Sequence, residues 1–134
     1  MIVADSNLIA YLLIPGDKSE LSEQVFLRDP EWSVPLICRS EIRNILTLYM
    51  RYEGMSLPQA TRTMETAERL WGNREYAVSS DDVLELGFQH AVTAYDAEFV
   101  VLAKQLGVAF VTFDKALRKA FPSIAISAED YLRR

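Results

Sequence analysis

The sequence predicts an α/β fold: a three-layer α/β/α sandwich with a central parallel sheet of about five strands. Three observations support this prediction. Short apolar segments recur along the chain, as expected for strands that are buried on both faces. Segments with helical spacing of apolar residues lie between them, and parallel strands need such crossovers. The 134 residues contain no internal repeat, charged tail or linker-like stretch, so we expect one domain spanning residues 1–134.

The first 52 residues should form two strands and three helices, in the order Met1–Ala4, Ser6–Ile14, Ser19–Arg28, Trp32–Val34 and Leu36–Tyr52. The first segment is short and apolar, as a buried strand is. Pro15-Gly16 ends the first helix, and the turn Asp29-Pro30 precedes the second strand. The third helix has apolar residues at core spacing, and Gly54 follows it as a stop signal.

The rest of the chain continues the alternation. We expect a helix between Ser56 and Gly72, a strand Tyr76–Val78, helices Ser80–His90 and Ala94–Leu106, a strand Val108–Thr112, a helix Asp114–Phe121, a strand Ile124–Ile126 and a terminal turn Glu129–Arg133. Ser56 is a good N-cap, and Pro58 suits a first helical turn. Asp81 and Asp82 suit the N-terminus of the next helix, and Gly107 closes the one after it.

Composition limits the classes of function. Half of the residues are hydrophobic and a quarter are charged, which is ordinary for a globular domain. The single cysteine, Cys38, excludes an internal disulfide. We see no signal peptide, and the apolar stretches are shorter than the roughly 20 residues of a membrane span, so we expect a cytoplasmic protein without a membrane partner. The net charge of −5 argues against a passive nucleic-acid binder more than against a metal-dependent nuclease.

Four carboxylates are expected to meet at one edge of the sheet, namely Asp5, Glu41, Asp96 and Asp114. Asp5 and Asp114 come directly or shortly after strands, at the carboxyl edge where sites form in open parallel sheets. Glu41 and Asp96 lie near the starts of helices, and a helix that follows a strand begins at this same edge. The helix of Asp96 does not follow a strand directly. Each acid also has a simpler interpretation, as a helix cap, a first-turn acid or a solvated helical residue.

Carboxylates that are drawn together repel one another and raise one another's pKa values. A hard divalent cation with oxygen ligands relieves this repulsion, and Mg²⁺ or Mn²⁺ are the natural occupants. The sequence offers no set of His and Cys ligands, so we do not expect zinc. The pattern of all four acids, rather than any one of them, therefore predicts a metal site.

At these residues the sequence resembles PIN-domain proteins, and in particular the VapC-like toxins of prokaryotic type II toxin–antitoxin pairs. Four motifs carry the resemblance in order and spacing: Ile2-Val3-Ala4-Asp5-Ser6-Asn7, Arg39-Ser40-Glu41-Ile42, Tyr95-Asp96-Ala97-Glu98-Phe99 and Val111-Thr112-Phe113-Asp114. The resemblance covers essentially the whole chain, including its length. It implies a PIN-like fold and a metal-dependent endoribonuclease.

The resemblance also implies roles for particular residues. The quartet Asp5, Glu41, Asp96 and Asp114 would be catalytic and would bind Mg²⁺ or Mn²⁺, with Ser6, Asn7 and Thr112 in support. Asp5 and Asp96 would be direct ligands of one ion, whereas Glu41 or Asp114 would orient the attacking water. Metal-activated water would leave a 5′-phosphate and a 3′-hydroxyl. The number of ions stays open. The implied partners are an RNA substrate, a cognate antitoxin that covers the acidic pocket, and a second copy in a homodimer.

Other residues have weaker interpretations. We expect His90 to be structural or on the surface and Cys38 to be a small core residue. Basic residues near the acids either contact substrate phosphates or are solvated: Arg39, Arg43, Arg51, Lys115, Arg118 and Lys119. Four helical aromatics either form a groove or dimer surface or belong to the core: Tyr11, Tyr49, Tyr52 and Trp71.

The same residues argue against two alternative functions and leave two others open. A haloacid dehalogenase-type phosphatase needs a second Asp where this chain has Asn7, and a receiver domain needs a mid-chain phosphoacceptor that is not evident. A DNA-directed nuclease with a related acidic site stays open. The alternative from another class is a non-catalytic interaction protein whose acidic pocket binds metal or a basic peptide.

Overall fold

The computed structural model describes residues 1–134 and contains one five-stranded parallel sheet with the strand order β3-β2-β1-β4-β5. The strands are β1 (Ile2–Ala4), β2 (Trp32–Pro35), β3 (Glu75–Tyr76), β4 (Phe110–Val111) and β5 (Ala125–Ile126). In the register of the centre, Val3 lies opposite Ser33 of β2 and Phe110 of β4. The predicted α/β class and the parallel sheet of five strands are confirmed.

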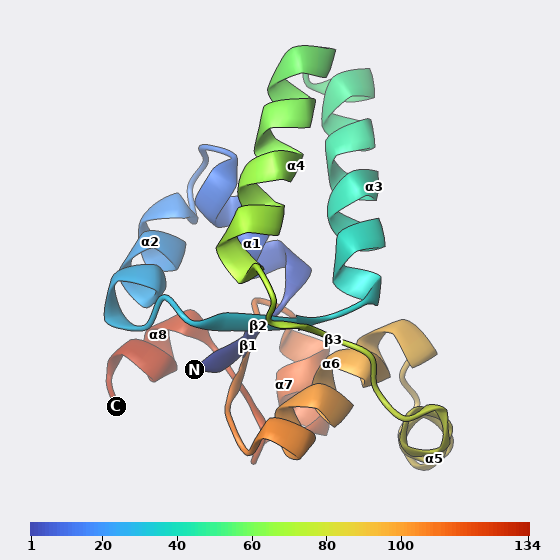
Figure 1. Cartoon of the computed structure of the whole chain (residues 1–134). Coiled ribbons are helices and arrows are strands. Elements are labelled where there is room, and N and C mark those ends of the chain that lie inside the picture. The colour runs from blue at the N-terminus through green and yellow to red at the C-terminus, as the bar shows by residue number, and fades with distance from the viewer.

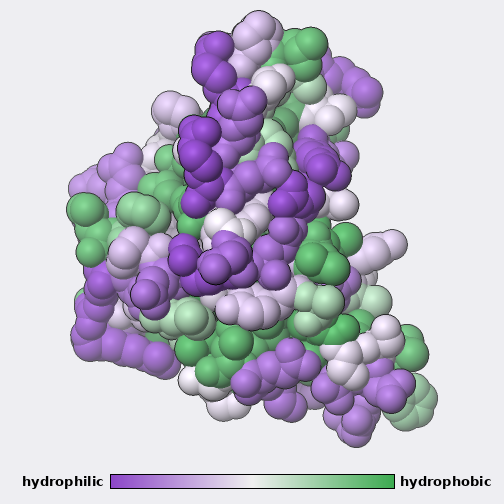
Figure 2. Space-filling view, in the orientation of Figure 1, coloured by the Kyte–Doolittle hydropathy of each residue, from purple (hydrophilic) through white to green (hydrophobic).

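Helices cover both faces of this sheet (Figure 1). They are α1 (Ser6–Leu13), α2 (Ser19–Arg28), α3 (Ile37–Tyr52), α4 (Leu57–Trp71), α5 (Ser80–Gln89), α6 (Ala94–Leu106), α7 (Lys115–Ala120) and α8 (Ala128–Leu132). In Figure 1, α1, α3 and α4 lie above the sheet, and α5, α6 and α7 lie below it. Helices α3 and α4 form a long hairpin that stands away from the sheet, with the side chains on the outer face of α4 mostly hydrophilic in Figure 2.

The buried core joins the two helical layers through the sheet. Its largest fully buried side chains include Trp32, Trp71, Phe99 and Phe110. Helix α6 packs against β1, β2 and β4, so apolar residues surround most of its middle. Trp71 is therefore a core residue and does not contribute to a groove or dimer surface. None of the eight helices is both long enough and apolar enough to cross a membrane.

Several predicted boundaries were wrong at the ends of the sheet. Strand β3 begins at Glu75 instead of Tyr76, because the Arg39 guanidinium pairs with the Glu75 carboxylate and allows a charged residue in the strand. Strand β4 is shorter than predicted, since the Val108 N–H still bonds to the carbonyl of Ala103 in α6. The predicted terminal turn is the helix α8, which the Ser127 side chain caps at 3.0 Å.

Candidate functional site

The four acids line one open pocket of about 440 Å³ at the carboxyl edge of the sheet. Asp5 lies between β1 and α1, Glu41 is on α3, Asp96 is in the first turn of α6, and Asp114 caps α7. The other lining residues are Ser6, Asn7, Ile37, Ser40, Asn44, Ile45 and Tyr95. The predicted convergence of the four carboxylates is thus present in the structure.

Asp5 is the most constrained of these acids. It is 8% exposed, and both of its carboxylate oxygens accept hydrogen bonds. The Ser6 backbone N–H donates to Oδ1 at 2.8 Å, and the Thr112 hydroxyl donates to Oδ2 at 2.5 Å. These donors fix the orientation of the carboxylate and leave its remaining lone pairs available to a ligand. Thr112 does not line the pocket but lies directly behind Asp5, fully buried.

Ser6 connects Asp5 to Glu41. The Ser6 hydroxyl donates to Glu41 Oε1 at 2.6 Å, so Glu41 is held on the α1 side of the pocket. The Sγ atom of Cys38 lies 3.4 Å from the same hydroxyl oxygen. Cys38 is completely buried, and burial raises the pKa of its thiol far above the usual range. Cys38 is therefore a protonated core residue, as predicted, and offers no thiolate.

Asp5 and Asp114 are both helix caps, as their simpler interpretations expected, and this role is compatible with membership of the acidic pocket. Asp5 caps α1, and the Oδ1 atom of Asp114 accepts from the Leu117 N–H of α7 at 3.1 Å. The Thr112 hydroxyl accepts from the Asp114 N–H at 2.9 Å, so one hydroxyl positions both acids. Asp96 lies in the first turn of α6, as its simpler interpretation expected, and Thr93 caps this helix at 3.1 Å. The Asp96 side chain remains directed to the pocket that it lines.

The carboxylates influence one another electrostatically. The pKa of Asp5 is raised to about 7, mainly by burial and to a smaller extent by the charges of Glu41 and Asp96, while the hydrogen bonds from Thr112 and Ser6 oppose the rise. Burial, followed by Asp96 and Glu98, raises the pKa of Glu41. Burial and then the charge of Asp114 raise the pKa of Asp96. The protein thus holds three acids in a state that a nearby cation would stabilise.

The donor set suits a hard divalent ion, because it consists of carboxylate, hydroxyl and amide oxygens. In this structure, however, no three His, Cys, Asp or Glu side chains lie close enough to ligate one ion together. An ion would have to draw the carboxylates inward. The hydroxyl bridge from Ser6 to Glu41 is one contact that could change when this happens.

Three pocket residues had no role in the sequence-based prediction: Ser40, Asn44 and Tyr95. Asn44 lies four residues after Ser40 and three residues after Glu41, so helical periodicity places its side chain next to both of them on α3. Tyr95 is adjacent to Asp96 and is 60% exposed. This periodicity is the only signal for Ser40 and Asn44 in the sequence, and it is a weak one because these residue types are common on any helix.

The predicted basic and aromatic candidates fall into different environments. Arg39 forms an ion-pair network with Glu68 and Glu75. Arg118 donates to the carbonyl of Thr112 at 3.0 Å. His90 is half-buried with its ring 4.6 Å from that of Phe121, which agrees with a structural role. The other basic candidates are exposed and do not line the acidic pocket: Arg43, Arg51, Lys115 and Lys119.

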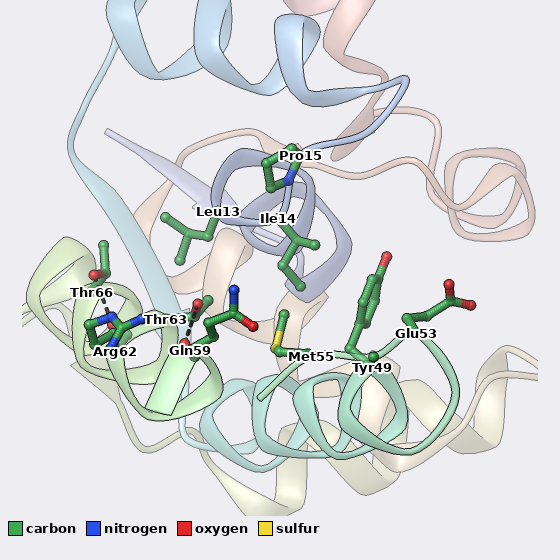
Figure 3. A pocket seen from close by; sticks show the side chains of 11 residues that line it. Leu13, Ile14, Pro15, Tyr49, Glu53, Met55, Gln59, Arg62, Thr63 and Thr66 are labelled. Atoms are coloured by element: carbon green, nitrogen blue, oxygen red, sulfur yellow. Dashed lines mark hydrogen bonds between the residues drawn. The ribbon is translucent and has the colours of Figure 1, made fainter. Parts of the chain in front are cut away.

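A larger pocket of about 590 Å³ lies at the far end of α1 (Figure 3). In this view Leu13, Ile14 and Pro15 face Tyr49 and Met55, while polar residues of α4 form the opposite wall. Glu53 is the only carboxylate among its lining residues. Its size does not make it the better candidate for catalysis, because the chemically coupled groups are all in the acidic pocket.

Comparisons with known proteins identify chains of similar sequence and similar fold. No protein-family model matches the chain. The chain is 29% identical over 129 residues to Ribonuclease VapC3 of Pyrobaculum aerophilum, which covers 92% of this chain and 96% of that protein. The crystal structure of PAE2754 from Pyrobaculum aerophilum is similar with a TM-score of 0.77 and 18% identity, covering 99% of this chain and 87% of that one. A toxin-antitoxin complex from Klebsiella pneumoniae is similar with a TM-score of 0.68 and 18% identity, covering 96% and 98%.

At 18% identity the two solved structures establish the shared fold. The sequence relative adds similarity along nearly the whole of both chains. Together they confirm the resemblance of this chain to VapC-like PIN-domain proteins.

Proposed function

We propose that this protein is a Mg²⁺- or Mn²⁺-dependent endoribonuclease and the toxin of a toxin–antitoxin pair, acting in the cytoplasm. The observation that carries the proposal is the convergence of Asp5, Glu41, Asp96 and Asp114 in one open pocket. The name of the relative, Ribonuclease VapC3, supports RNA as the substrate. When bound, the metal would supply positive charge to the scissile phosphate and activate water for attack.

The residues of the chain would divide the remaining work. Asp5 would bind the cation with an orientation set by Thr112 and the Ser6 N–H. Asp96 would bind it from the opposite layer of the sandwich. Glu41 and Asp114 would accept a proton from water or hold water in place for attack.

A cleavage assay tests the proposal. The protein is incubated with single-stranded and structured RNA, and with DNA of the same sequence, in Mg²⁺, Mn²⁺ or EDTA. We expect cleavage of RNA that requires the metal and leaves a 5′-phosphate. Asp5→Asn and Asp96→Asn should each reduce the rate by at least about 100-fold, the scale on which removal of one electrostatic group commonly acts.

Other results of the assay would separate the alternatives. RNA cleavage at the wild-type rate by Asp5→Asn or Asp96→Asn, or cleavage that continues in EDTA, would contradict the assigned site. Metal binding without cleavage of any nucleic acid would indicate the non-catalytic interaction protein. Preferential cleavage of DNA would identify a DNA-directed nuclease on the same acidic site.

We also propose two protein partners. One is a cognate antitoxin, an assignment supported by the toxin-antitoxin complex among the structures of the same fold. The acidic pocket would accept an Arg or Lys side chain of this antitoxin among its carboxylates. The other partner is a second copy of the chain in a homodimer. Copurification with the product of the neighbouring reading frame tests the first, and loss of nuclease activity in the complex is the expected result.

A further inference from the structure

Tyr95 is an exposed aromatic residue beside the acids. It lines the same pocket as Asp96 and is 60% exposed, so its ring is not part of the core. It is the second residue of α6, two positions after the cap Thr93. An exposed flat ring next to a proposed phosphodiester site is therefore available to a ligand.

The neighbouring wall of the pocket complements this ring. Asn44 and Ser40 are exposed residues one turn apart on α3, and both line the pocket together with the half-buried Ile37. No other side chain or backbone group in the chain forms a hydrogen bond with the Asn44 amide. An amide of this kind carries both donors and an acceptor, so it can pair with the edge of a nucleobase.

The negative charge of the pocket explains why contacts to a base would be needed to bind RNA there. The pocket presents four carboxylates, and the exposed basic candidates lie outside it. Contacts to phosphates therefore contribute little to RNA affinity within the pocket beyond what a bound cation supplies. Stacking and hydrogen bonds to a base do not depend on the charge of the pocket, and single-stranded nucleic acids are commonly held in this way.

We propose that Tyr95 and Asn44 bind the nucleotide next to the scissile phosphate, with the Tyr95 ring stacked on the base and the Asn44 amide bonded to its edge. The inference rests on the proposed ribonuclease function. It names the residues that would give the site its affinity for RNA and its preference among bases. Tyr95 and Asn44 are positioning residues, because they contact the substrate away from the reacting atoms.

The first test is steady-state kinetics on a short single-stranded RNA. Tyr95→Ala should raise KM by about 5- to 150-fold, the change that corresponds to the usual strength of base–aromatic stacking, with a smaller effect on kcat. Tyr95→Phe keeps the ring and should recover most of the affinity. Asn44→Ala should alter the preference among the four bases at one position of the substrate. Tyr52→Ala is the matched control, since Tyr52 is 71% exposed and outside the pocket.

A second test is independent of cleavage. Binding of a fluorescent single-stranded RNA is measured in the Asp5→Asn background, with and without Tyr95→Ala. Weaker binding on loss of Tyr95 supports the inference even if the wild-type protein cleaves no RNA, so failure of the two proposals can be distinguished. Unchanged KM and unchanged binding in Tyr95→Ala, or no binding of RNA at all, would overturn it.

Discussion

At the scale of single residues, Asp5 combines opposing requirements. Its carboxyl must be ionised to bind a cation, yet burial raises its pKa from 3.8 to about 7. The folded protein therefore binds one more proton than the unfolded chain between these two pH values. The stability that the neutral carboxyl allows is fully present below pH 3.8 and is lost as the pH rises to about 7.

This sign leads to a prediction for Asp5→Asn. Without metal and above pH 7, the free energy of unfolding of the variant should exceed that of the wild type by about 2–4 kcal/mol. The difference should shrink as the pH falls and vanish well below pH 3.8, where Asp5 is neutral in both states. Urea unfolding in EDTA at a series of pH values measures it. Asp17→Asn, at an exposed position, is the control, and a difference that does not depend on pH would contradict the buried, charge-coupled Asp5.

The hydroxyl of Thr112 is a second residue-scale determinant, because it contacts both Asp5 and Asp114. Thr112→Val keeps the shape but removes the donor to Asp5, so the pKa of Asp5 should rise further. The acid limb of the kcat/KM profile should then move to higher pH, and the protein should lose about 1–3 kcal/mol of stability. Thr112→Ser should restore both.

The control for this variant is Thr47→Val on the exposed side of α3, where the hydroxyl bonds only to the carbonyl of Arg43. It should leave the pH profile where it is in the wild type. An unchanged acid limb in Thr112→Val would mean that the hydroxyl does not set the protonation of Asp5.

At the scale of elements, the position of α3 determines where Glu41 lies. Arg39 precedes Glu41 by two residues, and its guanidinium donates to both carboxylate oxygens of Glu75 at 3.0 and 2.8 Å. A third nitrogen pairs with Glu68 of α4. One side chain thus connects the start of α3 to β3 and to α4. The geometry makes Arg39 a structural residue instead of a phosphate contact.

Arg39→Ala should therefore destabilise the protein, on the order of 2 kcal/mol, since it removes charge-assisted hydrogen bonds. Arg39→Lys should recover only part of this loss, because an ammonium cannot reproduce the paired geometry. Thermal unfolding measures the change, and Arg43→Ala at an exposed position of α3 is the control. An unchanged melting temperature together with a shallower salt dependence of KM would indicate a phosphate contact after all.

The elements also show what the sequence could predict. The apolar first strand, the capped helices and the glycine-ended α6 follow local rules, so the α/β order and the meeting of Asp5 with Asp114 could be predicted. The start of β3 could not, because it depends on a partner of Glu75 that is 36 residues away. The same holds for Asn44 and Tyr95, whose shared pocket requires the packing of α3 beside α6.

At the scale of the whole molecule, one surface is unusually apolar. Helix α5 exposes Phe88 at 93% and Leu84 at 68%, one turn apart. Leu84 also lines a shallow pocket of about 310 Å³, together with four other apolar residues and with Ser80 and Glu98. In Figure 2 a few hydrophobic side chains lie among hydrophilic ones in the region of α5 at the lower right. Because the Phe88 ring and part of this pocket lie on the same helix, two copies related by a two-fold axis could each insert the ring into the pocket of the other.

This surface is where we expect the proposed homodimer to form. An aromatic side chain buries roughly 150–250 Å². A symmetric dimer with both Phe88 rings in the contact would remove the most exposed apolar side chain of each copy from water. Phe88→Glu places a charge in the centre of the contact, so it should produce a monomer at concentrations where the wild type sediments as a dimer. Sedimentation velocity at a series of protein concentrations measures this. Tyr52→Glu, at an exposed aromatic residue of α3 outside the surface, should remain dimeric. A monomeric wild type, or a dimer that persists in Phe88→Glu, would contradict the assignment of α5 to the interface.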